Sequence, residues 1–450
     1  MVTDHTRLAA GQEEALQAGP KAFTTVGVTE EICMTHVTGP VVHLQRLDYD
    51  DEILAHVVTP KGRLTLTRGL GSGLARRPGD PADRLWAVGD RGPNVKAPFA
   101  IDHYGLDHLK PFRKIDGVKV MAFSDGPAIG PAISELRIEG DRVVRVHTLA
   151  LSDGDGRPIS GLPIHDGMGE TAIDMAGRIL APDPSGADSE GIAAAADGTF
   201  WVADEYGPSL LHVGSDGRVV KRWVPEGTAS AFAGAGYPVA DVLPAIATRR
   251  QFNRGFEAVA LSPDDAWLYV AFQSPLAHPD EDAHRHARHI RIWKLNSATG
   301  EVAGQFLYPL DKPSSFRRDA ALGEMHRSDL KVSEITTIAE DRLLVLERGS
   351  ATAKLYVVYL DDDCAIDRRH LDVATRPTVE EFSGENLPGG MMPVLAKRLV
   401  LSTDDYAQID ADLEGVAILG PRTLLLVNDN DFGVAGVRTA FWRVELATDL

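Results

Sequence analysis

Acidic side chains recur at equivalent positions in four stretches of this 450-residue sequence. The stretches are SEGIAAAADGTFWVADEYG (189–207), FEAVALSPDDAWLYVAFQS (256–274), SEITTIAEDRLLVLERG (333–349) and LEGVAILGPRTLLLVNDND (413–431). Each has a glutamate in second position, and these are Glu190, Glu257, Glu334 and Glu414. Each also ends in a polar group, and these are Asp204, Gln273, Glu347 and Asn428–Asp429. Carboxylates gathered at one place repel one another unless a cation, arginines or protons compensate their charge.

These side chains have the chemistry of a site for a hard cation. Carboxylate and amide oxygens without soft ligands favour Ca²⁺, with Mg²⁺ or Mn²⁺ as alternatives. A cation held in this way polarises a phosphoryl oxygen and lowers the pKa of a bound water. We therefore predict a metal site whose ligands are Glu190, Asp204, Glu257, Glu334 and Glu414.

Arginines near the acidic positions favour an anionic substrate. Arg254 lies just before the second stretch, and Arg348 lies near the end of the third. A guanidinium beside a metal holds a phosphate or carboxylate in bidentate fashion, so we predict that both neutralise developing charge. Glu205 or Asp429 is the candidate proton acceptor. In the structural alternative, each repeated glutamate pairs with an arginine, Arg91 included, or caps backbone N–H groups within its own repeat.

Short β-strands must position these residues. Apolar runs such as LWAV, FWVA, LYVAF and KLYVVYL alternate with turn residues, which is typical of a mostly-β protein. Each stretch reads as two strands and a tight turn, and a further strand pair follows, so that one repeat corresponds to one propeller blade. A fifth copy, GSGLARRPGDPADRLWAVGDRG (71–92), has Ser72 in place of the glutamate and ends at Asp90. We predict an all-β fold, a β-propeller of six four-stranded antiparallel blades, with seven as the alternative. The terminal segments are expected to pair and close the ring.

Blade geometry explains why carboxylates stand at both ends of each stretch. The first strand of a blade runs along the central channel, and the second strand returns antiparallel to it. The start of the first strand and the end of the second strand therefore lie on the same face of the propeller. Long inserted loops are expected at 153–187, 226–252, 277–288 and 312–331. The Gly- and Ala-rich insert 226–252 is a candidate lid for this acidic channel mouth.

Bulk properties limit the possible partners and compartments. Residues 1–20 read as a flexible N-terminal segment and residues 21–450 as one domain. The net charge of −19 disfavours nucleic acid and anionic membranes, and no apolar run approaches membrane-spanning length. The N-terminal residues carry no apolar signal core, which predicts a cytoplasmic protein, or a secreted or periplasmic one if a leader was removed.

Cys33 and Cys364 are too far apart in the sequence for a zinc–thiolate motif. The expected partner is a small-molecule ester or phosphoester.

Few other motifs in the sequence could support chemistry. The sequence has no GxSxG elbow, P-loop or HExxH motif, so a covalent triad is not supported. The segment HPDEDAHRHARH (278–289) contains four histidines, and these are His278, His284, His286 and His289. It reads as a solvated hairpin insertion, with a transition-metal site as the alternative.

The repeats and their surroundings resemble the phytase-like β-propeller family, described by the phrase "esterase-like activity of phytase". The matching stretches are SEGIA…GTFWVADEYGP, NRGFEAVALSPD…LYVAFQSPL, RIWKLNSATGEVAGQFLYPLD, LLVLERG and LEGVAILGPRTLLLVNDNDFG. They run in family order from about Gly71 to Phe432, and GSGL at 71–74 fits a family element that accounts for Ser72. The resemblance implies a β-propeller that hydrolyses an ester or phosphoester. The His-rich insert has no counterpart in the family pattern.

Together these observations favour a metal-dependent hydrolase that acts on a phosphate ester at an acidic channel mouth. One alternative is a Ca²⁺-dependent lactonase or carboxylesterase-like propeller. Another is a non-catalytic binding propeller whose cation is structural.

Overall fold

The structure is a computed structural model that describes residues 41–123, 129–382 and 392–450. His36–Leu450 forms one compact unit, and Met1–Thr35 is assigned to a second unit that lies outside the described residues. The predicted N-terminal segment 1–20 and Cys33 also lie outside them. No helix in the described ranges is long and apolar enough to cross a membrane.

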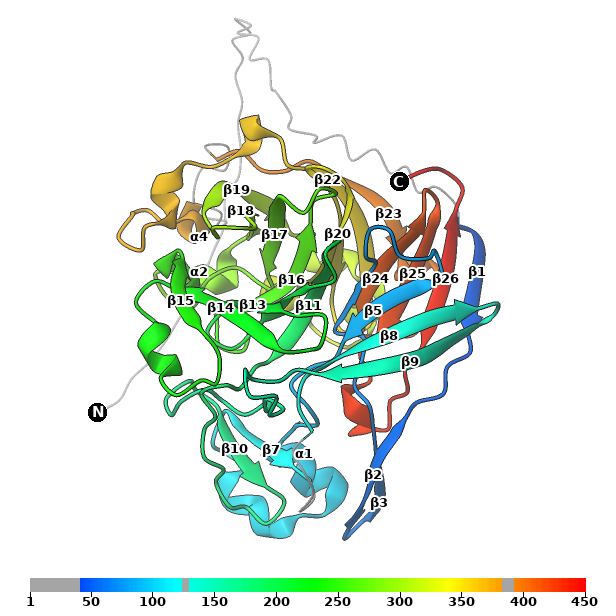
Figure 1. Cartoon of the computed structure of the whole chain (residues 1–450), viewed down its shortest axis with the longest axis vertical. Helices are drawn as coiled ribbons and strands as arrows, with labels where there is room; N and C mark the ends of the chain where they lie inside the picture. The colour runs from blue at the N-terminus through cyan, green and yellow to red at the C-terminus, as the bar shows by residue number, and fades with distance from the viewer. Residues whose placement is uncertain (1–40, 124–128, 383–391) are drawn as a thin grey trace, which may run out of the picture. The chain divides into compact units, whose positions relative to one another are not determined.

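β-Strands dominate the described residues and form five sheets of four or five strands (Figure 1). The first contains β4 (Gly73–Ala75), β5 (Arg84–Val88), β8 (Ala132–Glu139) and β9 (Arg142–Ala150). The second contains β11 (Ser189–Ala194), β12 (Phe200–Asp204), β13 (Ser209–Val213), β14 (Val219–Pro225) and β15 (Val239–Leu243). The third contains β16 (Phe256–Leu261), β17 (Trp267–Phe272), β18 (His289–Asn296) and β19 (Val302–Pro309). The fourth contains β20 (Lys331–Ala339), β21 (Arg342–Arg348), β22 (Ala353–Tyr359) and β23 (Lys397–Ser402). The fifth contains β24 (Leu413–Gly420), β25 (Thr423–Asn428), β26 (Phe441–Leu446) and β1 (Val41–Leu47).

Smaller elements occupy the connections. A hairpin is formed by β2 (Ile53–Thr59) and β3 (Gly62–Thr67), and a three-stranded sheet by β6 (Val95–Lys96), β7 (Val118–Ala122) and β10 (Thr171–Asp174). The helices are short: α1 (Ala97–Phe99), α2 (Glu281–His286), α3 (Arg317–Leu322) and α4 (Val379–Phe382), with single turns such as η3 (Ala229–Phe232) and η4 (Ala245–Arg249). The mostly-β prediction is therefore confirmed.

The first strands of the five large sheets contact one another in a cyclic order, β4–β11–β16–β20–β24 and back to β4. This is the order that blades take around the axis of a propeller. The predicted count of six blades is not confirmed, because five sheets of the described region take part. Residues 53–67 form the separate hairpin β2–β3 and belong to none of the five large sheets.

The two ends of the described region meet in one sheet, as the sequence predicted. Strand β1 pairs antiparallel with β26, with Val41 opposite Leu446 and Leu47 opposite Phe441. The fifth sheet is thereby completed by a strand from the other end of the chain.

A β-bulge lies at the repeated glutamate. In the third sheet Phe256 is opposite Phe272 and Ala258 is opposite Ala271, so Glu257 is the extra residue. Equivalent register shifts occur near the starts of β11, β20 and β24. A bulge breaks the alternation of side chains and re-aims the residue it carries, and bulges are frequent beside active sites.

Candidate metal centre

Five buried carboxylates gather where the inner strands β11 and β16 begin. They form two groups that share Glu190, in each of which one oxygen per residue lies within 4.8 Å of the others. One group is Asp90, Asp188 and Glu190, and the second is Glu190, Glu205 and Glu257.

Close packing of the inner strands brings these residues together. A Cβ on Gly191 would lie 2.6 Å from the Glu257 carbonyl oxygen, and one on Gly73 would lie 2.7 Å from that of Glu190. Any side chain at either position would push neighbouring strands apart. The glycine that follows Glu190 in the repeat therefore allows the close approach of β11 to β16.

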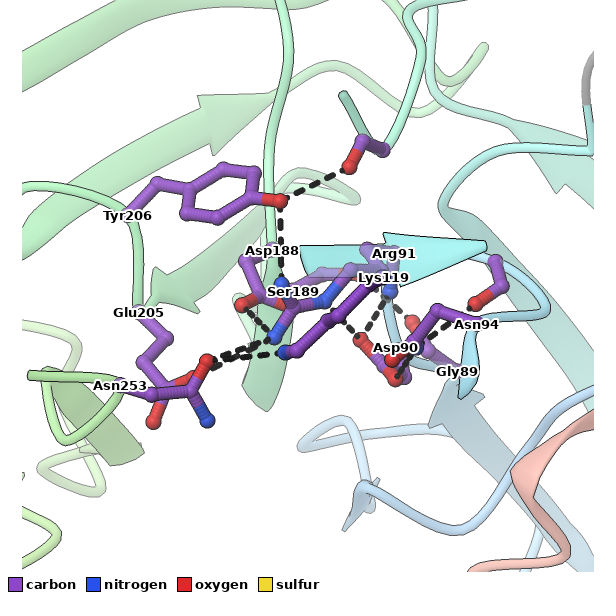
Figure 2. Close-up of polar contacts among 12 residues, drawn as sticks. Gly89, Asp90, Arg91, Asn94, Lys119, Asp188, Ser189, Glu205, Tyr206 and Asn253 are labelled. Carbon is purple, nitrogen blue, oxygen red and sulfur yellow. Dashed lines mark hydrogen bonds and ion pairs between the residues drawn. The ribbon is translucent and has the colours of Figure 1, made fainter. Parts of the chain in front are cut away.

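Arg91 provides the direct positive charge for this cluster. Its guanidinium forms ion pairs with Asp188, with Asp90 at 3.3 Å and with Glu205 at 3.4 Å, as Figure 2 shows. It also reaches Glu170 at 2.7 Å. One guanidinium shared among four carboxylates leaves a large excess of negative charge.

Lys119 and Glu170 from inserted segments and Tyr206 from the first repeat complete the network around Arg91. Lys119 on β7 pairs with Glu170 at 2.5 Å and donates to Asn253 Oδ1 at 3.1 Å. The Tyr206 hydroxyl lies 3.1 Å from a Glu170 oxygen and donates to the Gly161 carbonyl at 3.0 Å. These contacts fix Arg91 on one side of the cluster.

Several buried polar atoms at the site have no hydrogen-bond partner among the described residues. They include Glu205 Oε1, Glu257 Oε2 and Arg254 Nη1. Leaving charged groups buried and unpartnered is costly. Carboxylate oxygens that converge without donors fit a hard divalent cation, so the residues present suit Ca²⁺ or a similar ion.

The electrostatics of the cluster favour the binding of a positive charge. Burial, followed by the charges of Glu257 and Asp188, raises the pKa of Glu190 well above its usual range. Burial and the charge of Glu205 raise the pKa of Glu257 to about 7. A bound divalent cation reverses both effects, because it favours the ionised carboxylates.

The stabilisation by Ca²⁺ is expected to increase with pH. In the cation-free protein the pKa of Glu257 rises from 4.5 to about 7 on folding, so its ionisation destabilises the fold as pH increases across this window. Calcium bound by these carboxylates would compete with the protons, so we expect tighter binding at pH 8 than at pH 5.5. Melting curves with and without Ca²⁺ should show the larger temperature shift at pH 8. An equal or larger shift at pH 5.5 would contradict this expectation.

Of the five predicted metal ligands, Glu190 and Glu257 lie in the cluster. Asp204 lies outside both groups, because its carboxylate is held by Arg222, by Ser209 Oγ at 2.6 Å and by the Asp188 N–H at 2.7 Å. Its oxygens are occupied, so it orients Asp188 rather than offering a ligand atom to a cation.

The other two predicted ligands follow the structural alternative. Glu334 accepts hydrogen bonds from the backbone N–H groups of Leu74 at 2.9 Å and of its neighbour Ile335 at 3.1 Å. Glu414 forms an ion pair with Arg348. Identical positions in the repeat thus have different partners.

The predicted catalytic residues lie around the cluster in different settings. Glu205 lies among the candidate ligands. Arg254 is half-buried and is under the influence of Glu205 and Glu257, while burial lowers its pKa. Arg348 is engaged by Glu414, by Asp412 at 2.6 Å and by Ser333 Oγ at 2.8 Å. Through these contacts Arg348 fixes the position of the Glu414 carboxylate.

Asp429 lies in a second acidic patch next to the cluster. Burial, followed by the charges of Asp431 and Asp90, raises its pKa well above the usual range. Burial and the charges of Asp90 and Asp412 raise the pKa of Asp431 to about 6. The two carboxyls border the site without belonging to either group of converging oxygens among the described residues.

Several residues of the site were absent from the predicted set. Asp188 directly precedes the first repeat, and Asp90 ends the fifth copy, so both had a positional signal. Glu170 and Lys119 come from inserted segments, and no positional signal in the sequence marked them.

The histidines of 278–289 form no group with metal-binding geometry in the described part of the chain. His278 contacts Arg376 and His284 contacts the Pro275 carbonyl.

Asp204→Asn is expected to lower the free energy of unfolding by about 3–5 kcal/mol, because it leaves the fully buried Arg222 without its countercharge. Urea unfolding at pH 7 measures the change. Asp216→Asn is the control, since Asp216 is exposed and lies 3.8 Å from Arg218. Equal stability of Asp204→Asn and wild type would show that the pair does not anchor the second sheet.

Comparison with known proteins identifies the family of this chain. The family model "Phytase-like: Esterase-like activity of phytase" matches residues 65–432. The chain belongs to this family. An "Uncharacterized secreted protein" of Arthroderma benhamiae is 26% identical over 276 residues, which cover 54% of this chain and 51% of that protein. The match therefore spans about half the length of that curated relative.

Solved structures also resemble the phytase-like chain at low identity. A luciferin-regenerating enzyme is 11% identical, with a TM-score of 0.31 and coverage of 84% of this chain and 78% of that one. A protein from Lactobacillus plantarum is 12% identical, with a TM-score of 0.32 and coverage of 86% and 89%. Virginiamycin B lyase from Staphylococcus aureus is 10% identical, with a TM-score of 0.30 and coverage of 90% and 99%.

Proposed function

We propose that this phytase-like protein is a divalent-cation-dependent hydrolase of an ester, with a phosphate ester as the favoured substrate and Ca²⁺ as the favoured ion. The observation that supports it most is the convergence of Glu190, Glu205 and Glu257, whose oxygens lie within 4.8 Å of one another in a buried site. Glu205 and Glu257 each keep an oxygen without a hydrogen-bond partner among the described residues. The family description, esterase-like activity, supports hydrolysis as the reaction class.

Each residue of the site has a role in this proposal. Glu190, Glu205 and Glu257 would hold the cation, which when bound supplies Lewis-acid polarisation and an activated water. Arg254, whose Nη1 has no hydrogen-bond partner in the described structure, would bind an anionic ester oxygen. Asp429 stays the candidate for proton transfer, and Arg348 orients Glu414 at the edge of the site.

A second candidate is a lactonase or carboxylic-ester hydrolase. Asn253 lines a narrow pocket next to Glu205 together with Met168 and Phe252, and it can donate a hydrogen bond to a neutral carbonyl oxygen. A cation-binding propeller without catalysis is the third possibility.

Hydrolysis assays separate these candidates. A phosphomonoester, a phosphodiester, a lactone and a carboxylic ester are each tested after EDTA dialysis and after restoring Ca²⁺ or Mn²⁺. The proposal expects phosphate-ester hydrolysis that EDTA removes, Ca²⁺ restores and Glu257→Gln abolishes. Activity on the lactone alone would favour the second candidate. No activity on any substrate, together with a Ca²⁺-dependent rise in melting temperature, would favour the binding propeller.

A further inference from the structure

A cavity of about 490 Å³ lies beside the acidic cluster. Its volume is within the range of small-molecule binding pockets. Apolar side chains form much of its wall, among them Ile164, Met168, Phe232 and Phe252. The predicted lid segment 226–252 contributes η3 and the residues after η4 to this wall.

Three chain segments connect this cavity to the cluster. Residues 167–168 line the cavity, and Glu170, two residues later, binds Arg91. Gly207 and Pro208 line the cavity, and Glu205, two residues earlier, is a candidate ligand. Residues 250 and 252 line the cavity and are followed by 253–254 of the site.

A narrow pocket lies between the cavity and the site. It shares Met168, Arg250 and Phe252 with the cavity and is also lined by Glu205 and Asn253, among others. In this structure the narrow pocket is too small for a water molecule, so Met168, Arg250 and Phe252 separate the cavity from Glu205.

The wall of the cavity carries little charge. Its titratable side chains are Arg250 and His165, and none of its lining residues is acidic. A polyphosphorylated molecule needs several cationic partners for its phosphates, which this wall does not offer. The wall is suited to an uncharged, largely apolar group.

We propose that this cavity binds the uncharged alcohol part of the ester, and that Arg250 and Phe252, which line both the cavity and the narrow pocket, move aside so that the single ester group reaches Glu205. This inference rests on the proposed function. Hydrolysis of a phosphate monoester breaks the bond between phosphorus and the alcohol oxygen. The water oxygen bonds to phosphorus, and a proton from that water passes to the alcohol, which stays in the cavity until it dissociates.

Binding of 1-naphthol to the full chain in EDTA tests the cavity without requiring hydrolysis. Ser230→Trp fills the cavity from an exposed position of its wall. Ala298→Trp, at an exposed turn outside the wall, is the matched control. We expect wild type and Ala298→Trp to bind 1-naphthol in isothermal titration, and Ser230→Trp to bind at least about tenfold more weakly, which is about 1.4 kcal/mol. Equal binding by both variants, or no binding by wild type, would overturn the inference.

Steady-state hydrolysis rates measured with Ca²⁺ provide a second test of the same inference. For 1-naphthyl phosphate, Ser230→Trp should raise KM about tenfold while leaving kcat within about twofold. For methyl phosphate, which has no group to fill the cavity, the two tryptophan variants should behave alike. Preference of the wild type for inositol hexakisphosphate over 1-naphthyl phosphate would overturn the inference. Loss of hydrolysis in every assay, with 1-naphthol binding as expected, would contradict the proposed function and leave the cavity as a site for apolar alcohols.

Discussion

Glu190→Gln should abolish cation-dependent activity and raise the melting temperature of the cation-free protein. Glu190 is the residue shared by both groups of converging carboxylates, so its replacement removes a ligand charge from each. Cation affinity depends steeply on ligand charge, and we expect Ca²⁺ binding at least about 100-fold weaker. Without the cation, burial and the neighbouring carboxylates raise the pKa of Glu190, which lowers the stability of the fold at neutral pH, and the substitution removes this cost.

Glu334→Gln is the matched control for this experiment. Glu334 occupies the same position of its repeat and is also buried, but it accepts backbone hydrogen bonds outside the cluster. The control should keep Ca²⁺ binding. If both variants bind Ca²⁺ like wild type, the repeated glutamates are structural throughout.

Arg254→Met should reduce kcat/KM for a phosphate ester by about 100- to 1,000-fold, which is the usual effect of losing a group that stabilises transition-state charge. The variant should fold normally, because Arg254 Nη1 has no hydrogen-bond partner among the described residues and burial already lowers the arginine pKa. Steady-state rates with Ca²⁺ on 4-nitrophenyl phosphate measure the loss.

A neutral carboxylic ester provides the internal comparison for Arg254→Met. Because its carbonyl carries no full negative charge before attack, any hydrolysis of this ester should fall less than hydrolysis of the phosphate ester. An equal reduction for both substrates would mean that Arg254 supports the site as a whole and does not recognise an anion.

The repeat was the informative signal in the sequence. It correctly predicted hairpins whose ends meet, since Ser189 lies opposite Asp204 and Val332 lies opposite Glu347. It also predicted the convergence of Glu190 with Glu257. Both results follow from strand geometry, because equivalent positions of neighbouring inner strands lie at the same height.

The individual roles could not be deduced from the repeat. Glu334 and Glu414 differ from Glu190 in their local donors, and those donors depend on tertiary packing. Lys119 and Glu170 reach Arg91 from insertions without repeat periodicity. The β-bulges that re-aim the glutamates leave no pattern in the hydrophobic alternation of such short strands.

Calorimetric titration of the EDTA-treated wild-type protein with Ca²⁺ tests the central claim most directly. We predict saturable binding, a higher melting temperature in the bound form, and loss of both in Glu190→Gln but not in Glu334→Gln. Absence of binding and of any thermal shift with Ca²⁺, Mg²⁺ and Mn²⁺ at pH 8 would show that the five carboxylates are not a metal centre.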